Sequence, residues 1–140
     1  MVKVGGKPVL EHLIDHLAKF EIKQIIVNLH WKPQPLIDYF GDKLLYFYEP
    51  KLLGEKKTED RLRDWLGFEY LVMNGDTLTD IDINQMRMFS RGNTSYDDEV
   101  YTGIKYVLGG DSAWRRDYKC YWQYMGTVSG LQKARKRYGG

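Results

Sequence analysis

Three aspartates follow one apolar run closely. Residues Phe68–Met73 form the run, Asn74–Asp76 end it, and Asp80 and Asp82 come shortly after. A carboxylate at the carboxyl end of a strand, beside the N–H groups of a turn, suits a hard divalent cation such as Mg²⁺. The dipeptide Asn-Gly is also a strong turn signal. The local pattern therefore leaves a metal site and a simple turn both open.

Asp80 and Asp82 have a second interpretation. Both precede a helical pattern that begins near Ile83, where a carboxylate can accept hydrogen bonds from the first amides of a helix. We prefer this capping role for both over metal ligation. His12 and His16 are spaced i, i+4 on a predicted helix, which can bind zinc. Without a third ligand nearby in the sequence, a surface or boundary position is preferred.

Other reactive side chains give weaker signals. Cys120 is the single cysteine and lies in an aromatic run, which favours a buried, unreactive thiol and excludes an intramolecular disulfide. Gly54 is followed by Glu-Lys-Lys, but the phosphate-loop pattern fails because its second glycine is absent. Lys56 and Lys57 are therefore interpreted as solvated.

The composition is that of a globular domain. Hydrophobic residues make up 43% and charged residues 29% of the 140 residues, which predicts a real core. The net charge of +2 is too small to predict nucleic-acid binding. No stretch approaches the roughly 18 apolar residues of a membrane span, and no signal peptide is recognised. We expect a cytoplasmic protein with neither a nucleic-acid nor a membrane partner.

Helical and strand patterns alternate along the chain. Helices are predicted over residues 5–20, 33–42, 58–67, 82–89 and 126–140, with Thr58 and Thr127 as caps and with Val128, Leu131 and Ala134 on the buried side of the last one. Strands are predicted over residues 24–29, 43–50, 68–73, 100–107 and 118–125. Because βαβ crossovers are right-handed, the sequence predicts a single α/β domain with a three-layer, Rossmann-like, mostly parallel sheet and helices on both faces. Ligands of such sheets bind beyond the carboxyl ends of the strands, where Asn74–Asp76 are expected.

Five segments, in order, resemble the sugar-1-phosphate nucleotidyltransferases, enzymes that join a nucleoside triphosphate to a sugar phosphate and release pyrophosphate. They are VKVGGKPVLEHLIDHLAKFEIKQIIVNLHW, YFGDKLLYFYEPKLLG, YLVMNGDTLTDIDI, VYTGIKYV and YWQYMGTVSGLQKARK. The third is similar to the metal-bearing strand of the family, the fourth to its substrate-cavity strand, and the last to its closing W-x-D-x-G-T block. The resemblance favours the metal site over the simple turn.

The resemblance also implies site residues. Asp76 would hold Mg²⁺, and the contacts with a nucleotide or sugar phosphate would involve Asn74, Gly75, Thr102, Gly103, Glu49 and Gly54. The last two of these would border the base site. No catalytic residue is assigned.

The sequence departs from the family pattern in four ways. The glycine-rich GGxGTRL loop and a proline-lysine pair precede the first matching segment in the family, so the resemblance implies a domain over residues 1–140 that lacks the first strand and the signature loop. The second metal carboxylate falls on Tyr124, a neutral phenol. Glu-Lys-Lys replaces small residues after Gly54, and the region between Tyr106 and Trp122 is shorter than in relatives. Because nucleotidyl transfer depends on positioning and charge neutralisation, we expect weak or no activity.

The alternative is a noncatalytic interaction module. The missing first strand lies in the middle of the family's sheet, and an unfilled strand edge is a template for association, so a homo-oligomer is expected. The aromatic residues Trp114, Tyr118, Tyr121 and Trp122 could form a partner-binding surface or fill the domain's own core. The sequence leaves both interpretations open.

Overall fold

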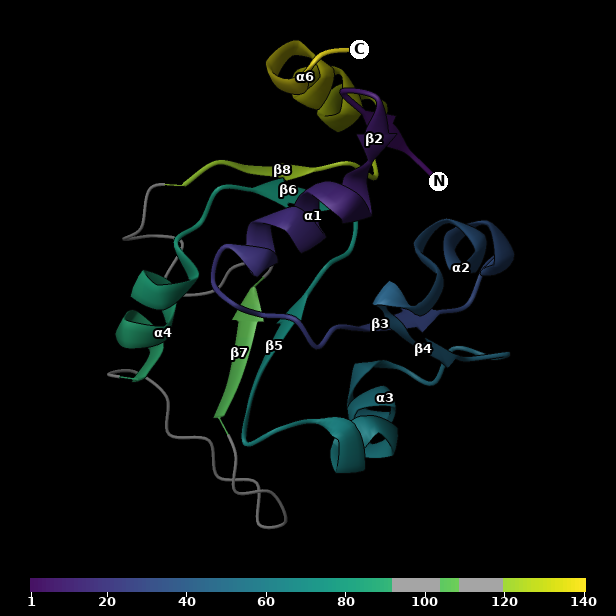
Figure 1. The fold of residues 1–140 in the computed structure, drawn as a ribbon, viewed down its shortest axis with the longest axis vertical. Coiled ribbons are helices and arrows are strands. Elements are labelled where there is room, and N and C mark those ends of the chain that lie inside the picture. The colour runs from purple at the N-terminus through teal and green to yellow at the C-terminus, as the bar shows by residue number, and fades with distance from the viewer. Residues whose placement is uncertain (92–103, 109–119) are drawn as a thin grey trace.

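The computed structural model describes residues 1–91, 104–108 and 120–140 (Figure 1). The helices are α1 (Val9–Ala18), α2 (Gln34–Phe40), α3 (Glu55–Leu62), α4 (Ile83–Arg91) and α6 (Val128–Tyr138), with short 3-10 turns η1 (Gly41–Lys43) and η2 (Arg63–Trp65). The strands are β1 (Lys3–Val4), β2 (Lys7–Pro8), β3 (Ile26–Leu29), β4 (Leu45–Tyr48), β5 (Glu69–Met73), β6 (Thr77–Thr79), β7 (Ile104–Leu108) and β8 (Trp122–Tyr124). The predicted mixture of helices and strands is confirmed, and the fold is broadly α/β.

The helices form where the sequence places apolar residues on one face. Val9, Leu13 and Leu17 of α1 are buried at the spacing of successive helical turns. The predicted cap of the last helix is confirmed, because the Thr127 hydroxyl accepts a hydrogen bond from the Gly130 amide at 3.0 Å. These two helices therefore follow from local sequence.

Two predictions about helices are wrong, one of a cap and one of a buried residue. Helix α3 begins at Glu55 after Gly54, whose φ of 89° lies in the left-handed region that favours glycine, so Thr58 lies inside the helix and is not its cap. Val128 is 76% exposed, because it occupies the first turn of α6 on the face away from the core. Leu131 is half-buried and Ala134 is buried, as predicted.

The strands form four two-stranded ladders within the described ranges. Two are parallel, β3 with β4 and β5 with β7, and two are antiparallel, β1 with β2 and β6 with β8. The predicted continuous three-layer sheet is not confirmed. In Figure 1, β3 and β4 lie with α2 and α3 on one side of the molecule, whereas β6 and β8 lie beside α1. The short strands β1, β2 and β6 were not predicted.

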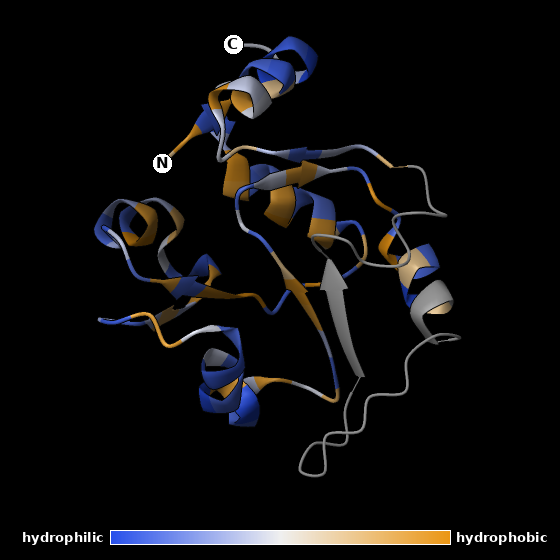
Figure 2. Ribbon diagram, turned by 180° about the vertical axis from the view of Figure 1, so that it is seen from behind, coloured by the Kyte–Doolittle hydropathy of each residue, from blue (hydrophilic) through white to orange (hydrophobic). Residues whose placement is uncertain are grey.

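The core consists of two clusters of buried side chains. Leu17, Ile81, Ile83 and Met86 form one, against which Cys120 and Trp122 pack. The other joins both ends of the chain and contains Val4, Val9, Leu78, Met125 and Ala134. In Figure 2, α1 and β5 carry apolar stretches, whereas α3 is mainly hydrophilic. Together the clusters fix β6 and β8 between α1 and α6.

The two ends of the chain lie next to each other (Figure 1). The Gly5 amide donates to the Gly139 carbonyl at 3.0 Å, and an added Cβ at Gly5 would lie 2.5 Å from the Tyr138 carbonyl oxygen. Only glycine therefore fits this turn, which has a φ of 55°. None of the helices in the described ranges has the length and the apolar character of a bilayer-spanning segment.

Candidate functional site

Residues Asn74–Asp76 connect β5 to β6, as the strand pattern predicted, and all three are exposed. The Asp76 carbonyl accepts a hydrogen bond from the Met125 amide at 2.8 Å, one step beyond the paired residues Thr77 and Tyr124. The backbone of Asp76 is therefore fixed to β8 while its side chain faces solvent. A carboxylate in this position can bind a hydrated cation without a large desolvation cost.

Tyr124 lies beside Asp76 in this ladder, at the position that the resemblance matches to a second metal carboxylate. The Tyr124 side chain is 46% exposed, and its hydroxyl lies 1.9 Å from where a Cβ on Gly126 would stand. The Tyr124 ring therefore packs against the backbone of Gly126, two residues further along the chain. No group of three or more His, Cys, Asp or Glu residues in the described ranges could hold a metal ion. A cation at Asp76 would take most of its ligands from water and from substrate phosphate oxygens.

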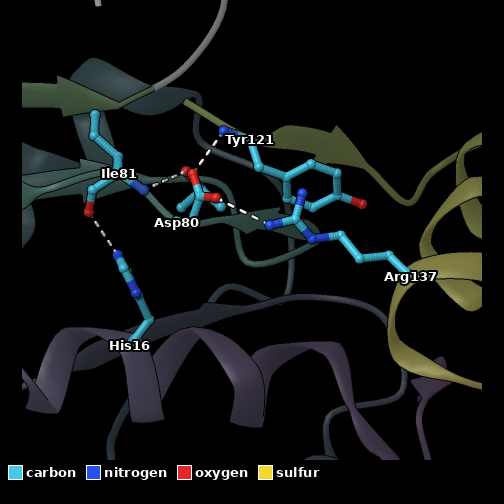
Figure 3. Close-up of polar contacts among 6 residues, drawn as sticks. His16, Asp80, Ile81, Tyr121 and Arg137 are labelled. Carbon is cyan, nitrogen blue, oxygen red and sulfur yellow. Dashed lines mark hydrogen bonds and ion pairs between the residues drawn. The ribbon is translucent and has the colours of Figure 1, made fainter. Parts of the chain in front are cut away.

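Asp80 and Asp82 have different roles. Asp82 accepts from the Gln85 amide at 3.0 Å, so its predicted cap of α4 is confirmed. The prediction for Asp80 is wrong: its carboxylate accepts from the Tyr121 amide at 2.6 Å and from the Arg137 guanidinium at 3.1 Å (Figure 3). Asp80 joins β6, β8 and α6 because the antiparallel ladder brings Tyr121 opposite the end of β6.

The same region is attached to α1. The His16 ring donates through Nε2 to the Ile81 carbonyl at 2.7 Å (Figure 3). The Ile81 amide donates to the Thr79 hydroxyl at 3.2 Å. The His12 ring similarly donates to the Val4 carbonyl at 2.8 Å. Both histidines are half-buried at the edge of the core, which is the boundary position that the sequence favoured.

Glu49 and Gly54 lie at the carboxyl end of the β3–β4 ladder. Glu49 is buried, and its carboxylate accepts from the Thr58 hydroxyl and from the Leu53 amide. The hydrogen bond from Thr58 is the main cause that holds the pKa of Glu49 below its usual value, and burial acts in the opposite direction. The carboxylate is therefore ionised near neutral pH, and it faces the protein interior.

The remaining predicted site residues are not placed. Thr102 and Gly103 lie outside the described residues. The strand that follows them begins at Ile104, which pairs with Glu69 at the end of β5 opposite to Asn74. The structure therefore brings together Asn74, Gly75 and Asp76 with Tyr124, and it places Glu49 and Gly54 at a separate strand end.

The aromatic segment near β8 fills the core. Tyr121 and Trp122 each pack against one of the two core clusters. Trp114 and Tyr118 lie outside the described residues. Cys120 is half-buried against the first cluster and is reduced, which agrees with a packing role. For Tyr121 and Trp122 the core interpretation is confirmed.

Sequence reasoning missed two residues that hold the site. Arg137 lies in the helix predicted over residues 126–140 and was given no role there, yet its guanidinium lies 4.0 Å from the centre of the Tyr121 ring and bonds to Asp80. Thr58 was treated as a helix cap, yet it bonds to Glu49 nine positions earlier. The buried position of Thr58 could have been inferred from the sequence, because Thr58 lies four residues before Leu62 and therefore on the same face of α3.

Two known proteins similar to this chain are named as nucleotidyltransferases of sugar 1-phosphates, and a third is named as a bifunctional protein. A D-glycero-alpha-D-manno-heptose 1-phosphate guanylyltransferase of Campylobacter jejuni is 32% identical over 96 residues, which cover 63% of this chain and 42% of the relative. An N-acetylmuramate alpha-1-phosphate uridylyltransferase of Neisseria meningitidis is 31% identical over 90 residues, or 59% of this chain and 39% of the relative. The bifunctional protein GlmU of Methanococcus maripaludis is 27% identical over 88 residues, or 61% of this chain and 21% of the relative. No protein-family model matches the chain.

The resemblance to sugar-1-phosphate nucleotidyltransferases is confirmed, as a partial one. It extends over about 60% of this chain, and the matched region spans less than half the length of each of these relatives. The relatives differ in the base and the sugar that their names specify. The similarity thus supports the class of chemistry and leaves the particular substrate open.

Proposed function

We propose that this chain, which matches part of the sugar-1-phosphate nucleotidyltransferases, binds a nucleoside triphosphate with Mg²⁺ at Asp76. In the family, the reaction converts a nucleoside triphosphate and a sugar 1-phosphate to a nucleotide sugar and pyrophosphate. The observation that carries the proposal is the exposed side chain of Asp76, whose backbone carbonyl accepts a hydrogen bond from Met125, the residue after β8. A magnesium ion there would neutralise charge on the phosphate groups.

The residues of the chain would contribute binding and orientation. The Asn74 and Gly75 backbone lies at the turn beside Asp76, where exposed amides can meet phosphate or sugar oxygens. The segment around Gly54 would border the base. These assignments are supported by the sequence resemblance and by the exposure of Asn74, Gly75 and Gly54. The substrate contacts of Thr102 and Gly103 rest on the resemblance alone.

We further propose that the 140-residue chain has weak turnover or none. Tyr124 stands where the resemblance places the second metal carboxylate, and a phenol is neutral near pH 7. Lys56 and Lys57, which are exposed in the first turn of α3, replace small residues beside the base site. Because the reaction is catalysed mainly by charge neutralisation, one missing carboxylate removes a main contribution.

Calorimetric titration tests the binding proposal. The chain is titrated with UTP, GTP and dTTP in the presence of Mg²⁺, and binding is expected for at least one of them. The variant Asp76→Asn keeps the size of the side chain and removes its charge, so it should lose the Mg²⁺-dependent part of the affinity. Absence of heat with all three nucleotides would remove the proposed function.

A gain-of-function variant tests the role of Tyr124. Tyr124→Asp supplies a second carboxylate beside Asp76, and we expect Mg²⁺ to bind at least about tenfold more tightly, because one or two carboxylates are the usual protein ligands of this ion. Tyr124→Phe is the matched control, because it removes the hydroxyl without adding charge. Equal Mg²⁺ affinity in the two variants would contradict the proposed site.

A second candidate function is association through strand edges. Within the described ranges, β3, β4, β5 and β7 each have a ladder on one side. Parallel sheets are normally larger and covered on both faces, so these edges can template further pairing. We propose a homo-oligomer in which such pairing extends the two parallel ladders toward the predicted three-layer sheet. Light scattering over a concentration series tests this, and a monomer at every concentration would contradict it.

A further inference from the structure

Glu49 is a buried charge with a complete set of internal partners. It directly follows β4, and only 2% of its surface is exposed. Burial of a carboxylate is costly unless hydrogen bonds compensate it. One carboxylate oxygen accepts from the Thr58 hydroxyl, and the other accepts from the Leu53 amide at 3.2 Å. Both oxygens are thus directed into the protein, and little of the side chain is left to touch a ligand.

These hydrogen bonds hold the segment between β4 and α3. Leu53 is bound to Glu49 through its amide, and the Gly54 carbonyl accepts from the Thr58 amide at 3.0 Å. Gly54 has a φ of 89°, and a Cβ added there would meet nothing within 4 Å. The chain therefore enters α3 at Gly54, which is exposed to solvent on one side. On the other side, the hydrogen bond to the buried Glu49 carboxylate fixes the backbone at Leu53.

The backbone of Glu49 extends this attachment to the neighbouring strand. Its amide donates to the Leu29 carbonyl at 2.8 Å, and its carbonyl accepts from Nδ1 of His30 at 2.7 Å. A single residue thereby joins the end of β3, the segment over residues 50–54 and the second turn of α3. Loss of its carboxylate would release the segment while the β3–β4 ladder stays paired.

We propose that Glu49 is a positioning residue for nucleobase recognition: its buried carboxylate fixes the backbone of residues 50–54, and the exposed side of that backbone meets the base. This inference rests on the proposed nucleotide binding. It assigns base selection to the shape of a main-chain segment, and not to direct contact with Glu49. A segment held in one conformation loses less entropy on binding, so the affinity and the preference among bases both depend on the buried hydrogen bonds.

Three variants and one control test the proposal on the full chain. Glu49→Gln removes the charge, and Thr58→Val removes the hydroxyl with little change of shape. Thr58→Ser keeps the hydroxyl, so its hydrogen exchange and its nucleotide affinities should match those of the wild type. Asp64→Asn is the control, because it removes one exposed negative charge from the turn after α3. Hydrogen exchange of residues 50–58 is measured by mass spectrometry, and the affinities for UTP, GTP and dTTP with Mg²⁺ are measured by calorimetry.

In Glu49→Gln and Thr58→Val we expect exchange in residues 50–58 to be at least about tenfold faster, because a charge-assisted hydrogen bond is lost. The preferred nucleotide should bind at least about tenfold more weakly, and the differences among the three bases should shrink. Exchange in β6 and α6 and the behaviour of Asp64→Asn should match the wild type.

Two results would overturn the inference. Unchanged exchange in both variants would show that the carboxylate does not hold the segment, and faster exchange with unchanged affinities and base preference would show that the segment does not select the base. A wild-type chain that binds no nucleotide gives a different result, because it removes the proposed function itself and the positioning role with it.

Discussion

Replacement of Asp80 by alanine tests how β8 and α6 are held against β6. The carboxylate accepts from the Tyr121 amide at 2.6 Å and from Arg137 at 3.1 Å. A hydrogen bond to a charged acceptor contributes about 1.5–3 kcal/mol to stability. An ion pair between half-exposed side chains contributes about 0.2–1 kcal/mol. Asp80→Ala should therefore lower the free energy of unfolding by about 2–3 kcal/mol, mostly through the amide.

Two further variants separate these contributions. Asp80→Asn keeps an acceptor for the Tyr121 amide and loses the charge, so it should cost about 1 kcal/mol. Arg137→Met removes the ion pair and the contact of the guanidinium with the Tyr121 ring, which lies 4.0 Å away, and should also cost about 1 kcal/mol. Urea unfolding at pH 7 gives the free energies, and the melting temperature should fall by about 3 °C for each kcal/mol.

The comparison can refute the assignment. If Arg137→Met is as destabilising as Asp80→Ala, then the ion pair is the main attachment and the amide contributes little. If Asp80→Ala is as stable as the wild type, then the carboxylate does not join the three elements. The order Asp80→Ala, then the two milder variants, is the result that the geometry requires.

Three other measurements follow from the structure. Gly126→Ala should lower the free energy of unfolding by less than about 1 kcal/mol, because the added Cβ would meet the end of the movable Tyr124 side chain. Gly130→Ala should lower it by more than about 2 kcal/mol, because the added Cβ would lie 2.0 Å from the Tyr124 carbonyl oxygen. Urea unfolding distinguishes the two variants. Tyr121→Phe should leave stability unchanged or raise it by about 1 kcal/mol in the same assay, because the buried Tyr121 hydroxyl has no hydrogen-bond partner in the described part of the chain. The hydrogen bond from Thr58 lowers the pKa of Glu49 in the folded protein. The stability that this carboxylate contributes is therefore present above its unfolded pKa of about 4.3 and is lost as the pH falls through its folded pKa. Glu49→Gln should reduce this loss of stability at acid pH, which unfolding measurements from about pH 3 to 6 can show.

The sequence predicted the parts of the fold that local patterns determine. Helix α1 has apolar residues on successive turns, and the caps of α4 and α6 at Asp82 and Thr127 need only amides three residues away. Strand β5 is mostly apolar and ends at Met73, directly before Asn74. Each of these features is set by residues close in the chain, so periodicity and capping chemistry were sufficient.

Pairing between distant segments was not predictable in the same way. Strand β6 is the short segment Thr-Leu-Thr, and it is a strand because β8 pairs with it from more than forty positions later. The start of α3 was misplaced because Thr58 looks like a cap, while Glu49 uses its hydroxyl. Gly54 was the better local signal for the start of α3, because its φ of 89° lies in a region that favours glycine.

The three aspartates after β5 show what decides whether a carboxylate is left for a ligand. Asp80 and Asp82 are adjacent to the same turn region and carry the same charge, but each accepts a hydrogen bond from an amide of the protein. Asp76 differs, because its backbone carbonyl accepts from Met125 while its carboxylate is exposed. Protein amides already donate hydrogen bonds to the carboxylates of Asp80 and Asp82, so a cation would have to compete with these amides for the carboxylate oxygens. A cation at the exposed Asp76 carboxylate would not face this competition. Which of the three carboxylates is left exposed for a ligand therefore depends on the distribution of amide donors around β6, β8 and α4, and the spacing of the aspartates in the sequence does not reveal it.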